Sequence, residues 1–197
     1  MISFLENFDR KLFFLINGFH SESADWVFYY VSFKFTWVPF YALLLFMCVK
    51  VLKKQWWLVL VFIPLLITAT DQISVQLFKN MFLRYRPCQN LEIKDQVHLV
   101  RGYCGGMYGF ISSHAANTFA LAMFVWLLLR KSYRYWWWIL FVGFAGLTAY
   151  SRVYLGAHYP ADVVVGALLG ISLGFLFYVL LQWIRGKLPG RQIKTSH

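Results

Sequence analysis

Residues 160–184 read PADVVVGALLGISLGFLFYVLLQWI, a run of 25 residues with one charged side chain, Asp162. A helix needs roughly 20 consecutive apolar residues to cross the hydrocarbon core of a bilayer. Proline is favoured in the first turn of a helix, where its missing N–H costs nothing. The stretch therefore predicts a membrane-spanning helix that begins at Pro160 and ends near Ile184.

The rest of the chain is similarly apolar. Of its 197 residues, 60% are hydrophobic and 21% are aromatic, which is too apolar for a soluble protein. Apolar runs over residues 26–49, 56–78, 112–129 and 135–150 predict four more spans. We expect an all-α, polytopic membrane helix bundle of about five transmembrane helices, with residues 1–197 forming a single domain.

The N-terminal residues 3–19 follow another pattern. Apolar side chains recur at helical spacing, and the charged side chains lie elsewhere on the helix: Glu6, Asp9, Arg10 and Lys11. This pattern is typical of an amphipathic helix that lies in the membrane interface. In a six-span alternative, residues 12–31 form a further transmembrane helix, which moves only the N-terminus across the membrane.

Lysine and arginine follow the first, third and fifth predicted spans. With five spans, these clusters share one side of the membrane: Lys50, Lys53, Lys54, Arg130, Lys131, Arg134, Arg185, Lys187, Arg191 and Lys194. The positive-inside rule makes that side cytoplasmic. The N-terminal helix, residues 80–111 and residues 151–159 then face the periplasm from a bacterial inner membrane. Because the basic residues flank apolar spans, the net charge of +11 indicates contact with membrane lipids, and we expect no nucleic-acid partner.

Two polar motifs surround the start of the third span. Before it, residues 79–87 read KNMFLRYRP, with Lys79 seven residues before Arg86. Taken alone, these cations are better explained as side chains that anchor a helix at the membrane edge. The span itself opens with three polar residues: Ser112, Ser113 and His114. Serine is a good N-cap, and the N–H groups of a helix start bind anions, although an ordinary capped helix explains the residues equally well.

A third motif precedes the last span and contains Ser151, Arg152, His158 and Asp162. The four-residue spacing puts Asp162 within reach of His158. A carboxylate bonded to one imidazole nitrogen fixes the tautomer and leaves the other nitrogen ready to act as a nucleophile. A salt-bridged staple between helices is the alternative, but ionisable side chains at membrane depth indicate a functional site by default.

Together, the three motifs resemble those of the type-2 phosphatidic acid phosphatase superfamily. The first motif (Lys, six residues, Arg-Pro) matches fully over residues 79–87. The third (Ser-Arg, five residues, His, three residues, Asp) matches fully over residues 151–162. The second, Pro-Ser-Gly-His, corresponds to residues 111–114 and differs at Ile111 and Ser113. These differences predict an altered pocket that retains activity.

Over residues 79–166, the resemblance implies a membrane lipid phosphatase that works through a phosphohistidine. His158 is expected to attack phosphorus, Asp162 to orient that imidazole, and His114 to protonate the leaving alkoxide. Five further residues are expected to bind the phosphate: Lys79, Arg86, Ser112, Ser113 and Arg152. The family works without a metal, so we expect neither a metal nor another cofactor.

The substrate is expected to be a lipid phosphate or diphosphate. The small size and the outward site favour undecaprenyl diphosphate or lipid A, with phosphatidylglycerophosphate and phosphatidic acid as alternatives. A lipid phosphotransferase, or a non-catalytic lipid-phosphate binder or transporter, uses the same basic cluster differently and also fits the sequence. Selectivity is expected to come from the loop over residues 88–111, and the sequence predicts no particular oligomeric state.

Two features outside the motifs carry structural predictions. Cys88 and Cys104 share the outer loop, and an oxidising compartment permits a disulfide between them that pins the loop beyond Arg86. Two free thiols are the equal alternative. Three glycines recur every fourth residue in the last span: Gly166, Gly170 and Gly174. This spacing permits close helix packing, which we expect within the bundle rather than in a dimer.

Overall fold

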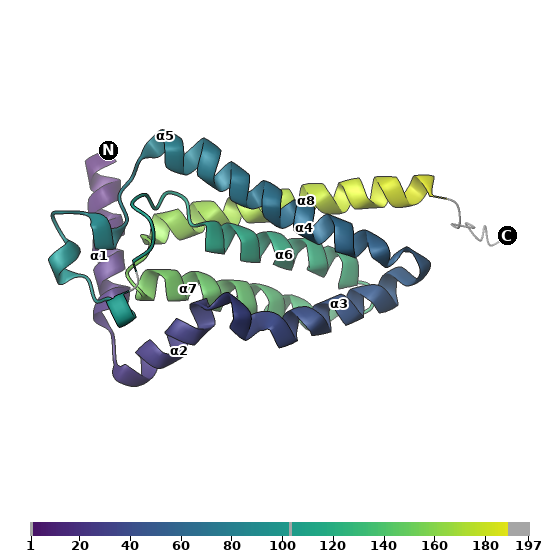
Figure 1. Ribbon diagram of the computed structural model, residues 1–197, viewed down its shortest axis with the longest axis horizontal. Helices are drawn as coiled ribbons and strands as arrows, with labels where there is room; N and C mark the ends of the chain where they lie inside the picture. The colour runs from purple at the N-terminus through teal and green to yellow at the C-terminus, as the bar shows by residue number, and fades with distance from the viewer. Residues whose placement is uncertain (1, 103, 189–197) are drawn as a thin grey trace.

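The computed structural model describes residues 2–102 and 104–188. Most helices run side by side along the long axis of the molecule, and one helix crosses their end (Figure 1). The α-helices are α1 (Ile2–Gly18), α2 (Glu22–Ser32), α3 (Val38–Leu52), α4 (Trp57–Ile73), α5 (Asn80–Phe82), α6 (Ser113–Leu129), α7 (Leu147–Tyr154) and α8 (Pro160–Lys187). The predicted all-α membrane bundle is confirmed.

Three continuous helical stretches are long and apolar enough to cross a membrane: Lys34–Gln55, Trp57–Phe82 and Pro160–Lys187. The second joins α4 to α5 through a π-helical segment, Ser74–Lys79. Helix α6 is a shorter apolar helix of 17 residues. A second π-helical segment, Trp138–Gly146, continues directly into α7, so the fourth predicted span extends to Tyr154. The chain is an integral membrane protein.

The first span begins later than the sequence predicts. Residues 26–49 are not one helix, because α2 ends at Ser32 and Phe33 adopts an extended backbone with φ −82° and ψ 117°. A 3₁₀ turn, Lys34–Trp37, then leads into α3. The indole N–H of Trp37 donates to the carbonyl of Val31 at 2.8 Å, which satisfies a carbonyl group left by the break.

Helices α6 and α8 pack backbone against backbone. A Cβ atom added to Gly166 would lie 2.6 Å from the carbonyl oxygen of Ser112. At Gly170 the distance to the carbonyl oxygen of Ala116 would be 2.2 Å. Only glycine permits this approach, so the predicted packing of the glycines within the bundle is confirmed. The contact fixes the start of α6 beside the start of α8.

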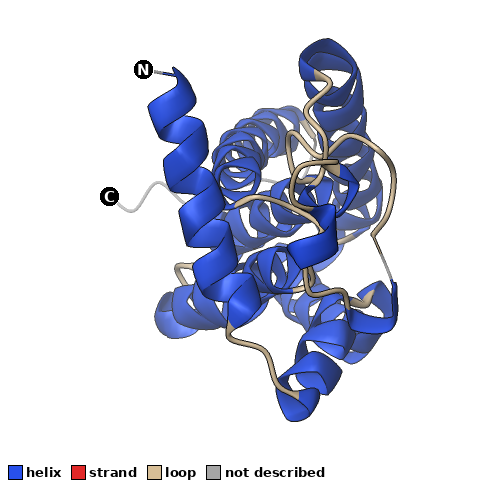
Figure 2. Cartoon of the chain, turned by 90° about the vertical axis from the view of Figure 1, so that its left-hand side faces the viewer, coloured by secondary structure: helices blue, strands red, loops and turns tan. Residues whose placement is uncertain are grey.

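The two ends of the bundle differ. Helix α1 lies across one end, beside the loop that precedes α6, and the view along the bundle shows it in front of the other helices (Figures 1 and 2). Its apolar side chains Phe4, Leu5 and Phe8 are exposed, whereas Asp9 and Phe13 are buried against the bundle. The opposite end holds the turn between α3 and α4 and the last turn of α8, where Lys50 to Lys54 and Arg185 to Lys187 lie. Arg191 and Lys194 lie outside the described residues.

Candidate active site

A cavity of about 650 Å³ opens among α3, α4, α6 and the segment before α7. Five of the predicted site residues line it: Lys79, Arg86, Ser113, His114 and His158. Arg152 instead lines a neighbouring cavity of about 330 Å³, which shares His114 with the first. Ser112 and Asp162 are buried behind the cavity wall. The three motifs therefore meet at one place in the fold.

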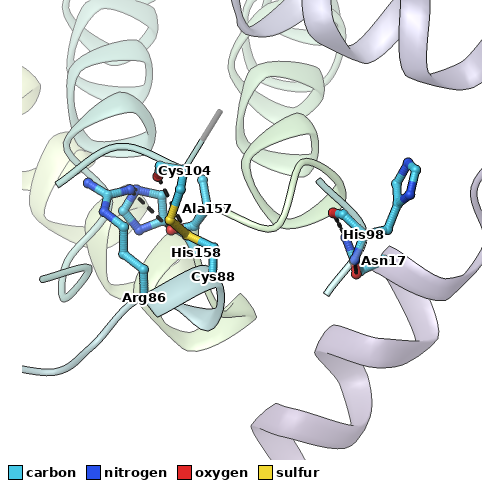
Figure 3. The surroundings of a disulfide bond; sticks show 7 residues. All are labelled: Asn17, Arg86, Cys88, His98, Cys104, Ala157 and His158. Carbon is cyan, nitrogen blue, oxygen red and sulfur yellow. Dashed lines mark hydrogen bonds between the residues drawn. A yellow bond between two sulfur atoms is a disulfide. The ribbon is translucent and has the colours of Figure 1, made fainter. Parts of the chain in front are cut away.

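Arg86 is held by a short backbone pairing between the segments around Tyr85 and Tyr108. Its side chain passes close to Gly109, where an added Cβ would lie 3.1 Å from the Arg86 Cγ. The Arg86 Nη1 donates to the carbonyl of Ala157 at 3.1 Å and to the His158 Nε2 at 2.8 Å (Figure 3). Because arginine offers only donors, the Nε2 is the accepting nitrogen of His158.

The second motif forms the start of α6. Ser112 is the N-cap, as predicted, and its Oγ accepts from the backbone N–H of Ala115 at 3.4 Å. Its own N–H donates to the backbone carbonyl of Asp162 at 2.9 Å, which ties α6 to α8. The Ser113 Oγ accepts from the Lys79 Nζ at 2.7 Å and lies 2.6 Å from the Ser74 Oγ. The side chain that replaces the family's glycine thus binds the lysine of the first motif.

The third motif brings a buried cation and a buried histidine together at the start of α8. Arg152 lies near the end of α7 and donates to the hydroxyl of Ser32. Its backbone carbonyl accepts from the N–H of His158 at 3.1 Å, which fixes the turn between α7 and α8. The Asp162 Oδ2 lies 3.7 Å from the His158 Nδ1, an ion-pair distance that is longer than a hydrogen bond.

The imidazole of His158 is 1% exposed and surrounded by cations. Burial lowers the pKa of His158 well below its ordinary value, and the charges of Arg86, Arg152 and Lys79 lower this pKa further. The imidazole is therefore neutral at neutral pH. A neutral imidazole with positively charged neighbours suits attack on an anionic phosphate, because the cations stabilise the charge that develops on the phosphoryl oxygens.

Two charged residues at the site were not predicted from the sequence. Arg84 lies within the first motif, at a position where the motif specifies no residue, and it bonds to Asp162 at 2.6 Å. The same guanidinium bonds to Asp9 of α1 at 2.6 Å. The sequence pattern places Asp9 only on the polar face of an interfacial helix. A third cation within residues 79–87 was the one signal that pointed to Arg84.

Cys88 and Cys104 form a disulfide with a Cα–Cα distance of 5.8 Å, as the disulfide prediction required. The bond lies beside Arg86 and His158 (Figure 3). It closes the part of the outer loop that contains Lys94 and His98. The loop therefore has a covalent link two residues after Arg86. No residue of 88–111 that the structure describes lines either cavity.

We expect the double substitution C88S/C104S to lower the melting temperature and to weaken substrate binding. A bridge that closes a loop of this length contributes about 3 kcal/mol by restricting the unfolded chain. The melting temperature and the KM for phosphate release, measured in detergent, check this expectation. Cys48 is buried in the bundle and far from the loop in sequence, so it stays unchanged and the wild type is the reference. Equal melting temperatures for C88S/C104S and the wild type would contradict the expectation.

Known proteins resemble this chain over most of its length. It is 40% identical over 193 residues to the lipid A 4′-phosphatase of Bacteroides thetaiotaomicron, covering 95% of this chain and 83% of that protein. It is 35% identical over 183 residues to the lipid A 4′-phosphatase of Porphyromonas gingivalis, covering 92% of this chain and 76% of that protein. Among solved structures, Aquifex aeolicus LpxE superposes with a TM-score of 0.62 and 27% identity, covering 85% of this chain and 92% of that one. Residues 56–185, which include all three motifs, match the PAP2 superfamily, and the chain belongs to that superfamily.

Proposed function

We propose that the protein is a membrane phosphatase that removes the 4′-phosphate of lipid A through a phosphohistidine on His158. The membrane fold and the superfamily support a lipid phosphatase. Two relatives that match this chain over more than nine tenths of its length are named lipid A 4′-phosphatases, which favours lipid A over undecaprenyl diphosphate, phosphatidylglycerophosphate and phosphatidic acid.

The observation that carries a lipid substrate is the composition of the larger cavity. One part contains the cations Lys79 and Arg86 beside His158. Another part is lined by apolar and aromatic side chains of the bundle: Trp37, Tyr41, Leu45, Ile63, Ile67, Leu121 and Phe144. Polar side chains lie among them: Ser32, Lys34, Asp71, Asn117, Thr118 and Thr148. A phosphate on a soluble metabolite gains nothing from such walls, whereas an acyl chain buries apolar surface against them. The cavity thus suits a molecule that carries a phosphate beside hydrocarbon.

In the proposed first step, the His158 Nε2 attacks phosphorus while the bond from phosphorus to the sugar oxygen breaks. His114, which lines the same cavity, takes up a proton when the anionic substrate binds and donates this proton to the leaving oxygen. Arg86, whose Nη1 donates to the Nε2 before substrate binds, releases this nitrogen for the attack and donates to the phosphoryl oxygens instead. Lys79 and Arg152 supply further positive charge, and the backbone N–H groups at the start of α6 complete the phosphate site.

In the second step, water attacks the phosphorus of the phosphohistidine. His114, now neutral, accepts a proton from the water, and the bond between phosphorus and the His158 Nε2 breaks. Inorganic phosphate leaves and His158 returns to its neutral form. Asp162 stabilises the positive charge that the imidazole carries while it is phosphorylated, as a buried carboxylate does for other catalytic histidines. Both steps use side chains of this chain, so the reaction is expected to need no metal.

The site faces the periplasm in this proposal. Support comes from the basic residues of the turn between α3 and α4 and of the last turn of α8, which lie at the opposite end of the bundle, as the positive-inside rule requires of a cytoplasmic side. The disulfide near the site gives independent support, because such bonds persist in oxidising compartments. Helix α1 then lies in the outer interface of the inner membrane, with its apolar residues in the lipid.

Phosphate release from a panel of lipids tests the proposal. The purified protein in detergent and chelator is given bisphosphorylated lipid A, lipid A with only the 1-phosphate, undecaprenyl diphosphate, phosphatidylglycerophosphate and phosphatidic acid. We expect release from the first lipid, and little from the lipid that lacks the 4′-phosphate. Faster release from another lipid would overturn the substrate, and dependence on an added metal would overturn the mechanism. Transfer of the phosphoryl group to a lipid without free phosphate would indicate a phosphotransferase.

A further inference from the structure

We propose that Arg84 and Asp9 are positioning residues for the pair formed by Asp162 and His158, so that the interfacial helix α1 is part of the active site. This inference rests on the proposed function. Arg84 stands at an unspecified position of the first motif, and Asp9 lies outside all three motifs. Neither residue lines the larger cavity. Their effect on the reaction passes through Asp162, which they hold in place.

The guanidinium of Arg84 bridges two carboxylates that come from opposite ends of the chain. Its Nη1 donates to the Asp162 Oδ1 at 2.6 Å, and its Nη2 donates to the Asp9 Oδ2 at 2.6 Å. The guanidinium carbon also lies 4.2 Å from the centre of the Tyr159 ring. A planar group with two charged partners and a ring against one face has a single orientation.

This bridge orients the carboxylate of Asp162 toward His158. The Oδ1 is bound by Arg84, and the Oδ2 accepts from the backbone N–H of Tyr159 at 3.0 Å. With both oxygens fixed, the Oδ2 is the atom that lies 3.7 Å from the His158 Nδ1. Asp162 is fully buried, so its charge needs a partner, and Arg84 supplies it without entering the cavity.

Helix α1 supplies the other half of the arrangement. Asp9 is buried, and its Oδ1 accepts from the backbone N–H of Ala161 at 2.9 Å, in the first turn of α8. Phe13, one turn further along α1, packs edge-on against Tyr159 with ring centroids 5.5 Å apart. One face of α1 therefore supports the residues on both sides of Pro160, while the opposite face carries exposed apolar side chains.

A second ion pair between α1 and the outer loop provides a matched control. Arg10 bonds to Glu92 at 2.6 Å, the same length as the bond between Arg84 and Asp9. This pair is more exposed to solvent: 33% of the Arg10 side chain and 69% of the Glu92 side chain are accessible. R10M removes a contact between α1 and the loop of residues 88–111 without touching Asp162. A merely structural role of α1 predicts that D9N lowers the melting temperature and leaves the kcat of the folded protein equal to that of R10M.

The experiment measures kcat and KM for the panel lipid that the wild type cleaves fastest, together with melting temperatures. Loss of a partner that orients a metal-bound histidine lowers activity by about 10- to 100-fold, and we expect a similar range for a partner that orients Asp162. We expect R84M to lower kcat by about 100-fold and D9N to lower kcat by about 10-fold. The KM of each variant is expected to stay within about twofold of the wild-type KM. R84K keeps the positive charge but loses the paired N–H donors of the guanidinium, so its kcat is expected to lie between those of R84M and the wild type. The kcat of R10M is expected to equal that of the wild type.

The outcomes separate this inference from the proposed function. A wild type that releases phosphate, with D9N and R10M equal in kcat, would overturn the positioning role and leave the phosphatase standing. A change in KM alone would overturn it as well, because it would place Arg84 on the substrate. If R84M fails to fold, D9N decides, since asparagine keeps the size of aspartate. A wild type without activity on any lipid would overturn the proposed function itself.

Discussion

Replacing His158 with alanine is expected to abolish phosphate release, with a loss on the order of 10⁴- to 10⁶-fold in kcat, as for other catalytic nucleophiles. Alanine leaves Lys79, Arg86 and Arg152 to bind the phosphate but removes the atom that attacks phosphorus. The expected signature is therefore a lost kcat with substrate binding retained. Single-turnover phosphate release and equilibrium binding of the lipid measure the two quantities separately.

His20 offers the matched control for this substitution. It lies at the same end of the molecule, and its exposed ring stacks on His98 with centroids 3.8 Å apart. H20A removes a histidine of that end without changing the cavity, so we expect activity near that of the wild type. If H158A keeps more than about a tenth of the wild-type kcat, His158 is not the nucleophile, because removal of a catalytic nucleophile lowers kcat far more than tenfold.

Replacing Gly170 with alanine is expected to produce the largest loss of stability among single methyl additions in α8. The new Cβ would lie 2.2 Å from the Ala116 carbonyl oxygen and 2.9 Å from the Ala120 nitrogen. Both are backbone atoms, so α6 itself must move. Overpacking a close helix contact costs about 1–3 kcal/mol or more. Because α6 begins at Ser113 and His114, the shift is also expected to lower activity.

The control for this change is Gly186→Ala in the same helix. Among the described residues, no heavy atom outside the local backbone lies within 4 Å of a Cβ at Gly186. Alanine is favoured over glycine in a helix by up to about 1 kcal/mol, so G186A is expected to melt at or above the wild-type temperature. If thermal denaturation in detergent gives G170A the same melting temperature as G186A, the close contact between α6 and α8 is wrong.

Local sequence determined much of the bundle, because span length and helix starts are local properties. Pro160 is the first residue of α8 and Ser112 caps α6, both as predicted. The break after Ser32 was not predictable in this way. At the break, the Ser32 hydroxyl accepts from Arg152, which lies 120 residues away. Apolar periodicity on its own continues through Phe33.

The motifs predicted which residues gather at the cavity, since each motif fixes its own local geometry. Lys79, Arg86, His114 and His158 come from different elements and line one cavity. Contacts of Asp162 were predicted less well. The four-residue spacing places it near His158, but its shortest bond is to Arg84, 78 residues away. No periodicity or spacing relates Arg84 to Asp9 or to Asp162, so only the folded chain reveals the bridge.

The most direct test of the central claim is to trap the phosphorylated enzyme. Purified protein is mixed with radiolabelled bisphosphorylated lipid A, quenched in alkali within one turnover, and digested for peptide mapping. The account predicts an acid-labile, alkali-stable phosphoryl group on the peptide that contains His158, and none in H158A. Release of labelled phosphate by the purified protein within one turnover, with no label on the peptide that contains His158, would contradict the account.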